Sequence, residues 1–99
     1  MASLSLVSLD NNVTLQVRQE GAGIPVLLVH GFPLDHQMWD EQFAVLGKSF
    51  RLIAPDLRGF GKSTVTPGTM RMEDYAHDLA KLLDALRINE PIVLCGLSD

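Results

Sequence analysis

The residues best suited to chemistry are Gly96-Leu97-Ser98, which follow the apolar run of residues 91–95. A serine hydroxyl becomes an effective nucleophile when a base takes its proton and hydrogen-bond donors stabilise the oxyanion that forms. A glycine two residues before the serine permits the sharp strand-to-helix turn that exposes such a hydroxyl. The same tripeptide is also compatible with a serine that only caps a helix. Ser98 is therefore a candidate nucleophile whose assignment depends on the rest of the chain.

A second segment of interest is His30-Gly31-Phe32, which directly follows the apolar run of residues 26–29. Gly31 allows the backbone to bend sharply toward a ligand. The side chain of His30 is expected to be a structural hydrogen-bonding group. The functional interest of this segment therefore lies in its backbone.

The third segment, residues 56–63, contains Gly61-Lys62-Ser63, which imitates the end of a phosphate-binding loop. That loop requires a glycine five residues before its second glycine, and Asp56 stands there instead. A nucleotide site is therefore disfavoured. We expect a tight loop in which Asp56 and Arg58 fix one another and the glycines permit unusual torsions.

The strands that must position these segments are predicted from apolar patterning. Residues 4–9 and 13–17 nearly alternate apolar with polar side chains around a turn, which indicates an antiparallel hairpin. The continuous apolar run of residues 26–29 is typical of a strand covered on both faces, so the sheet should become parallel there. Further strands are expected at residues 52–54 and 91–95.

Two helices are predicted between the later strands. Trp39, Phe43 and Leu46 recur at helical spacing, and Gly47 is expected to end that helix. Residues 73–87 form the clearer helix, with an expected left-handed residue at Asn89. Its expected apolar face consists of Ala76, Leu79, Leu82, Leu83 and Leu86. Its expected polar face consists of Asp74, His77, Asp78, Lys81 and Asp84.

Composition agrees with a soluble globular chain, and the order of the predicted elements makes residues 1–99 the N-terminal part of a single α/β domain. The 99 residues are 46% apolar and 20% charged, which is ordinary for a globular chain. A net charge of −4 argues against nucleic-acid and membrane partners. The N-terminus lacks a signal-peptide pattern, so a cytoplasmic location is expected. The lone Cys95 lies in an apolar run and is expected to be a buried, reduced thiol.

The segments 30–32, 56–63 and 96–98, in this order and spacing, resemble the N-terminal part of the α/β-hydrolase family. The resemblance covers essentially the whole chain. It is closest to the compact bacterial branch that includes esterases, 3-oxoadipate enol-lactonase and cofactor-free haloperoxidases. The fold it implies is an antiparallel first hairpin followed by parallel strands with helical crossovers, ending at the nucleophile elbow.

The resemblance also implies roles for individual residues. Ser98 would be the nucleophile, and the backbone N–H groups of Phe32 and Asp99 would be the oxyanion donors. Phe32, Leu34 and Trp39 are candidates to line the substrate pocket. No cofactor and no metal are implied.

The catalytic acid and histidine of this family follow the nucleophile in sequence, and no such residues follow Ser98 here. We therefore expect that they belong to a C-terminal segment of the same protein, and that the 99 residues are a truncated sequence or one polypeptide of a cut enzyme. His36 and His77 are expected to be solvated surface residues. Asp99 is disfavoured as a dehalogenase-type nucleophile because Leu97, rather than glycine, precedes it by two.

The function implied is hydrolysis of a small carboxylic ester or lactone through an acyl-enzyme, with activity only in the complete protein. Perhydrolysis by the same residues stays open. The alternative from a different class is a non-catalytic binding or receptor protein, or an inactive fragment, on the same scaffold.

Overall fold

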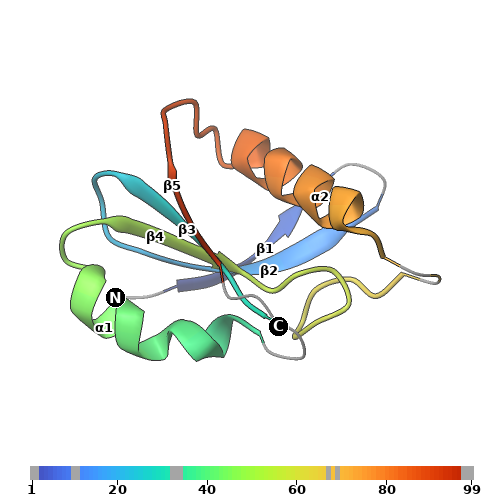
Figure 1. The fold of residues 1–99 in the computed structure, drawn as a ribbon, viewed down its shortest axis with the longest axis horizontal. Coiled ribbons are helices and arrows are strands. Elements are labelled where there is room, and N and C mark those ends of the chain that lie inside the picture. The colour runs from blue at the N-terminus through green and yellow to red at the C-terminus, as the bar shows by residue number, and fades with distance from the viewer. Residues whose placement is uncertain (1–2, 10–11, 32–34, 67, 69, 97–99) are drawn as a thin grey trace.

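The strands form one mixed sheet in the order β1-β2-β4-β3-β5 (Figure 1). The computed structural model describes residues 3–9, 12–31, 35–66, 68 and 70–96. The elements, in chain order, are β1 (Ser3–Ser8), β2 (Thr14–Glu20), β3 (Pro25–Val29), the 3-10 helix η1 (His36–Trp39), α1 (Asp40–Leu46), β4 (Arg51–Pro55), α2 (Met72–Ala85) and β5 (Val93–Gly96). The expected α/β architecture is confirmed.

The sheet changes from antiparallel to parallel pairing at β4. β1 pairs antiparallel with β2, as the hairpin pattern predicted, and β2 pairs antiparallel with β4. β4, β3 and β5 then run parallel to one another. Parallel strands place their carboxyl ends at one edge of a sheet, so β3, β4 and β5 end at the same edge.

The two faces of the sheet are covered by different helices, with α1 on one side and α2 on the other (Figure 1). Alternate residues of the central strands face the two layers. Leu27 and Ile53 belong to the apolar core that includes Leu82 of α2, whereas Leu28 and Leu52 belong to the core that includes Trp39 and Phe43. Both layers therefore depend on the continuous apolar runs of β3 and β4.

The first helical segment begins one turn earlier than its apolar stripe indicated. Asp35 caps η1 by accepting a hydrogen bond from the N–H of Gln37 at 2.8 Å. The chain continues without a break into α1, which ends at Gly47 as predicted; the N–H of Gly47 donates to the carbonyl of Phe43 at 3.1 Å. The stripe of Trp39, Phe43 and Leu46 packs against the sheet.

The second helix, α2, agrees with the prediction in position and differs in detail. Leu82 is fully buried as expected, but Asp78, assigned to the polar face, is also buried at 2% exposure, and Ala76 is exposed. The left-handed residue after the helix is Arg87, with φ of 57°, rather than Asn89. Among the described residues, no helix has the length and apolarity needed to span a bilayer.

The last strand, β5, lies at the edge of the described sheet (Figure 1). It is apolar, yet Val93 and Leu94 are 50% and 67% exposed. Cys95 is exposed too, so the expectation of a buried thiol was wrong. The apolar sequence of β5 is typical of a strand covered on both faces, yet its side chains are exposed among the described residues. Composition alone did not reveal this exposure.

Candidate functional site

The strands that precede the segments predicted to carry chemistry end side by side. Gly96 is the register partner of Val29, so β5 and β3 end at neighbouring positions. The segment after β4 emerges beside them, because β4 pairs with β3. In α/β sheets ligands bind outside the carboxyl ends of the strands, and this edge is therefore the candidate site.

Four of the predicted site residues lie outside the described residues. They are Phe32, Leu34, Ser98 and Asp99. Their roles as pocket-lining residues, nucleophile and oxyanion donors therefore stay predictions. What the structure describes is the set of side chains that flank them in the sequence.

His30 is a buried structural residue, as predicted, with 3% exposure. Its Nε2 accepts a hydrogen bond from the backbone N–H of Leu57 at 2.9 Å, and its Nδ1 lies 3.0 Å from the carbonyl oxygen of Gly31. An accepting Nε2 carries no proton, so Nδ1 is the protonated nitrogen that donates to Gly31. The ring also meets Phe60 edge to face, with centroids 5.2 Å apart.

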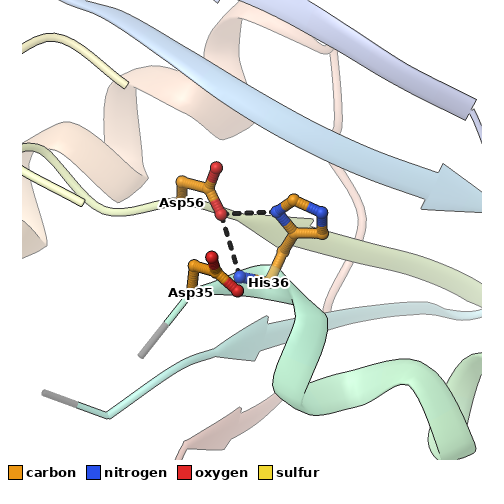
Figure 2. Close-up of side chains that lie close together, drawn as sticks. All are labelled: Asp35, His36 and Asp56. Atoms are coloured by element: carbon orange, nitrogen blue, oxygen red, sulfur yellow. Dashed lines mark hydrogen bonds and ion pairs between the residues drawn. The ribbon is translucent and has the colours of Figure 1, made fainter. Parts of the chain in front are cut away.

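His36 is buried at 6% exposure, which overturns the expectation of a solvated surface residue. Its backbone N–H and its Nδ1 both reach Oδ1 of Asp56, at 2.8 and 2.5 Å (Figure 2). His77, by contrast, is exposed on α2 as predicted. The difference arises because η1 turns back over the end of β4, which local sequence around His36 does not reveal.

Asp56, which follows β4, is completely buried and hydrogen-bonded through both of its carboxylate oxygens. Besides the two bonds from His36, its Oδ2 accepts from the N–H of Lys62 at 3.2 Å. Its carbonyl oxygen accepts from the hydroxyl of Ser63 at 2.5 Å, and its N–H donates to the carbonyl of Gln16 at 2.8 Å. A buried carboxylate needs such partners to offset its desolvation.

The expected mutual bond between Asp56 and Arg58 is absent from the described interactions, and each residue has another partner. The guanidinium of Arg58 forms a two-pronged bond to the carboxylate of Asp78 on α2, with Nε 2.8 Å from Oδ2. The hydrogen bond to Asp78 raises the pKa of Arg58. This ion pair connects the loop after β4 to α2, which covers the face of the sheet opposite α1.

Potential metal ligands also gather at this edge: Asp35, His36 and Asp56 place ligand atoms within 4.8 Å of one another (Figure 2). These atoms are already engaged, since Nδ1 of His36 bonds Asp56 and a carboxylate oxygen of Asp35 caps η1. Within the group, hydrogen bonds join His36 to Asp56, whereas Asp35 bonds the backbone of Gln37.

Trp39, proposed for the substrate pocket, lies mainly in the core between the sheet and α1, at 7% exposure. Its indole nitrogen is buried and has no hydrogen-bond partner among the described residues. Its role in a pocket stays a prediction.

A separate pocket lies at the boundary of β1 and α2, lined by Ser8, Leu9, Lys81, Asp84 and Ala85. It contains none of the predicted site residues. We therefore place the site at the strand ends rather than in this pocket.

The buried His36 and Asp56 pair was not predicted from the sequence. A usable signal was present: an aspartate directly after a buried strand, before a glycine-containing loop, is expected to be buried and to need donors. The sequence offers several donors, and only the folded chain selects His36.

Comparison with known proteins shows that this chain is similar to α/β hydrolases in both sequence and fold. Residues 24–98 match the family described as "alpha/beta hydrolase fold". An epoxide hydrolase from Caballeronia sordidicola is 39% identical over 88 residues, and a non-heme chloroperoxidase-like protein from Synechocystis sp. is 37% identical over 95 residues. Among solved structures, a thermophilic esterase from Thermogutta terrifontis is 46% identical with a TM-score of 0.88, and the epoxide hydrolase VrEH1 from Vigna radiata is 27% identical with a TM-score of 0.89.

The matches cover most of this chain and a minor part of each relative. They include 85% and 93% of the chain for the two sequence relatives, which correspond to 26% and 34% of those proteins. For the esterase and VrEH1 structures, 97% and 98% of the chain match 36% and 30% of theirs. The chain thus spans about a quarter to a third of the length of its relatives.

Proposed function

This chain belongs to the α/β-hydrolase family, and from that premise we propose that it forms the N-terminal part of a serine hydrolase for small carboxylic esters or lactones. The observation that carries the proposal is the register of Val29 with Gly96. It places the ends of β3 and β5, after which the segments 30–34 and 97–99 follow in the sequence, at neighbouring points of one sheet edge. A nucleophile and an oxyanion donor must converge in this way on one carbonyl group.

The proposed mechanism assigns one role to each residue. The hydroxyl of Ser98 attacks the substrate carbonyl carbon and loses its proton to a histidine. This histidine and the catalytic acid belong to a C-terminal segment of the same protein. The N–H groups of Phe32 and Asp99 stabilise the oxyanion. The tetrahedral intermediate then breaks its bond to the alkoxide oxygen of the ester or lactone, which takes the proton from that histidine, and water hydrolyses the acyl-enzyme to the carboxylic acid and free Ser98. Phe32, Leu34 and Trp39 border the acyl group in this proposal.

Replacement of Ser98 by alanine tests the assignment in the full-length protein. Turnover of p-nitrophenyl acetate is expected to fall by about 10⁶-fold in kcat, the scale of loss when a nucleophile is removed. Ser5→Ala, at an exposed position of β1, is the matched control and should retain full activity. A fluorophosphonate should label the parent protein and not Ser98→Ala. If the protein only binds ligands on this scaffold, the fluorophosphonate will not label it, and that result would contradict the proposal.

A second candidate function, the opening of an epoxide, is favoured by the names of two of the relatives above. If this chemistry used a carboxylate nucleophile, Asp99 would be the acidic residue at the predicted elbow, although Leu97 stands where an elbow centred on Asp99 would have glycine. Hydrolysis of styrene oxide by the parent protein, lost in Asp99→Asn and kept in Ser98→Ala, would support epoxide opening. The reverse pattern with p-nitrophenyl acetate supports the ester hydrolase.

A further inference from the structure

We propose that His36 and Asp56 form an acid–base dyad, in which Nε2 of His36 takes a proton from water during the hydrolysis of small activated esters. This activity goes beyond the proposed function, because it needs neither Ser98 nor a histidine from a C-terminal segment. Both members of the dyad belong to the described part of the chain, His36 at the start of η1 and Asp56 directly after β4.

The carboxylate of Asp56 is held in place by groups other than the imidazole. It is 0% exposed, and the backbone N–H of His36 donates to its Oδ1 at 2.8 Å, while the N–H of Lys62 donates to its Oδ2 at 3.2 Å. The backbone N–H of Asp56 donates to the carbonyl of Gln16 on β2 at 2.8 Å. Both carboxylate oxygens therefore accept from N–H groups, which is the bonding that suits an ionised carboxylate.

The imidazole of His36 meets this carboxylate through Nδ1, which lies 2.5 Å from Oδ1 of Asp56 (Figure 2). An ionised carboxylate only accepts hydrogen bonds, so Nδ1 carries the proton. In a neutral imidazole the other nitrogen then has no proton and keeps its lone pair. The bond to Asp56 thus selects the tautomer in which Nε2 of His36 can act as a base.

Nε2 of His36 lies on the side of the ring that faces away from Asp56 (Figure 2). None of the hydrogen bonds between described residues uses this nitrogen, and it is not one of the fully buried side-chain atoms without a partner, as the indole nitrogen of Trp39 is. It is therefore in reach of water, in agreement with the 8% exposure of the His36 side chain. A general base can act through one water molecule, so a small opening is sufficient.

The two other histidines of the chain lack this arrangement. Nε2 of the buried His30 already accepts from the N–H of Leu57 at 2.9 Å, so its lone pair is engaged. His77 is exposed on α2, away from any buried carboxylate bond that the structure describes. His36 alone thus combines a buried carboxylate partner on one nitrogen with an available lone pair on the other, among the described interactions.

The surroundings of the dyad favour proton transfer to Nε2. When the imidazole becomes charged, the carboxylate of Asp56 stabilises the imidazolium, as the aspartate of a hydrolytic triad does. Low exposure strengthens this attraction, because water screens it less. Asp56 follows β4, whose carboxyl end lies beside that of β3, and ligands of α/β sheets bind at this edge.

The reaction proposed for p-nitrophenyl acetate is direct hydrolysis. Nε2 of His36 removes a proton from water as the water oxygen bonds to the carbonyl carbon. The tetrahedral intermediate then breaks its bond to p-nitrophenolate and leaves acetic acid, and the imidazolium returns its proton to solvent. No group of the protein is acylated. A positioned general base contributes about 10²- to 10⁴-fold to such a rate.

The test uses the full-length protein with Ser98→Ala, so that acylation of Ser98 does not contribute. In this background, His36→Asn keeps an amide N–H that can donate to Asp56 but removes the basic nitrogen. We expect its kcat/KM for p-nitrophenyl acetate to be about 10²-fold lower, the lower end of the contribution of a general base. His77→Leu is the matched control and should leave kcat/KM unchanged. Unchanged hydrolysis in His36→Asn would overturn the dyad.

Rescue by added imidazole distinguishes a base from a structural residue. In the same background, imidazole should accelerate His36→Ala by a larger factor than it accelerates the protein that retains His36. Equal factors would overturn the dyad. Fluorophosphonate labelling of Ser98 tests the proposed function separately, and its failure leaves these expectations unaffected.

The tautomer of His36 can be measured without changing this residue, so the inference stays testable if its variants fail to fold. Nitrogen-15 NMR should find the proton on Nδ1, and a proton on Nε2 of the neutral ring would overturn the dyad. Asp56 is a positioning residue in this inference. Asp56→Asn should move the proton to Nε2, because its amide can donate to Nδ1.

Discussion

At the scale of single residues, Asp56 organises the candidate site. Its buried carboxylate is surrounded by donors from η1 and from its own loop. Gly61 packs directly on this carboxylate: an added Cβ would lie 2.2 Å from Oδ2 and 2.4 Å from Cγ of Asp56. The carboxylate has little freedom to move away, since His36 and Lys62 hold its two oxygens.

Gly61→Ala should therefore destabilise the protein through this contact. Gly61 and Gly59 have φ of +52° and +90°, so alanine at either position carries backbone strain of about 1–2 kcal/mol. Only at Gly61 does a clash add about 1–3 kcal/mol, because no atom lies within 4 Å of a Cβ at Gly59. Urea unfolding of the two variants measures the difference. Equal losses in free energy of unfolding would show that the carboxylate of Asp56 moves away from the added methyl group, and would contradict the prediction.

At the scale of elements, α2 is held by more than its apolar face. Leu82 and its apolar neighbours pack against the sheet, and Asp78 adds a buried bond to Arg58 in the loop after β4. This polar contact connects the helix on one face of the sheet to the strand ends where the candidate site lies.

Asp78→Asn should lower the free energy of unfolding by about 1.5–3 kcal/mol, the range for hydrogen bonds to charged groups. The loss in free energy of unfolding should be smaller than for a fully buried ion pair, since the side chain of Arg58 is 18% exposed. Asp84→Asn, an exposed aspartate on the same helix, is the control and should change stability by less than about 0.5 kcal/mol. Thermal or urea unfolding distinguishes them, and similar effects of both would contradict a specific role for Asp78.

At the scale of the whole molecule, the exposed strand β5 is the feature that most affects behaviour. Its apolar side chains and its unpaired edge in the described sheet favour association with another chain or segment. A purified polypeptide of these 99 residues, 10.9 kDa by mass, is expected to self-associate.

Light scattering with intact-mass measurement tests this expectation. Leu94→Lys, which places a charge on the 67% exposed Leu94, should reduce the associated fraction, whereas Val65→Lys at a 77% exposed loop position should not. A soluble monomer at all micromolar concentrations would count against it.

The sequence by itself determined the secondary structure and the order of the motifs. Alternating residues in β1 and β2, the apolar runs of β3 and β4 and the helical spacing of Trp39 and Phe43 each encode an element locally. The motif order then led to the resemblance, which the family match confirms. These features are readable because backbone periodicity is set by near neighbours in the chain.

Tertiary structure alone decided which polar groups meet. Asp56 pairs with His36 instead of the nearby Arg58, and Arg58 crosses to Asp78. It also decided that Cys95 is exposed, because β5 is the edge of the described sheet. Partner choice and exposure depend on which strands and helices become neighbours across 20 residues or more of sequence. Each buried charged group then forms hydrogen bonds with the partner that the fold places within bonding distance.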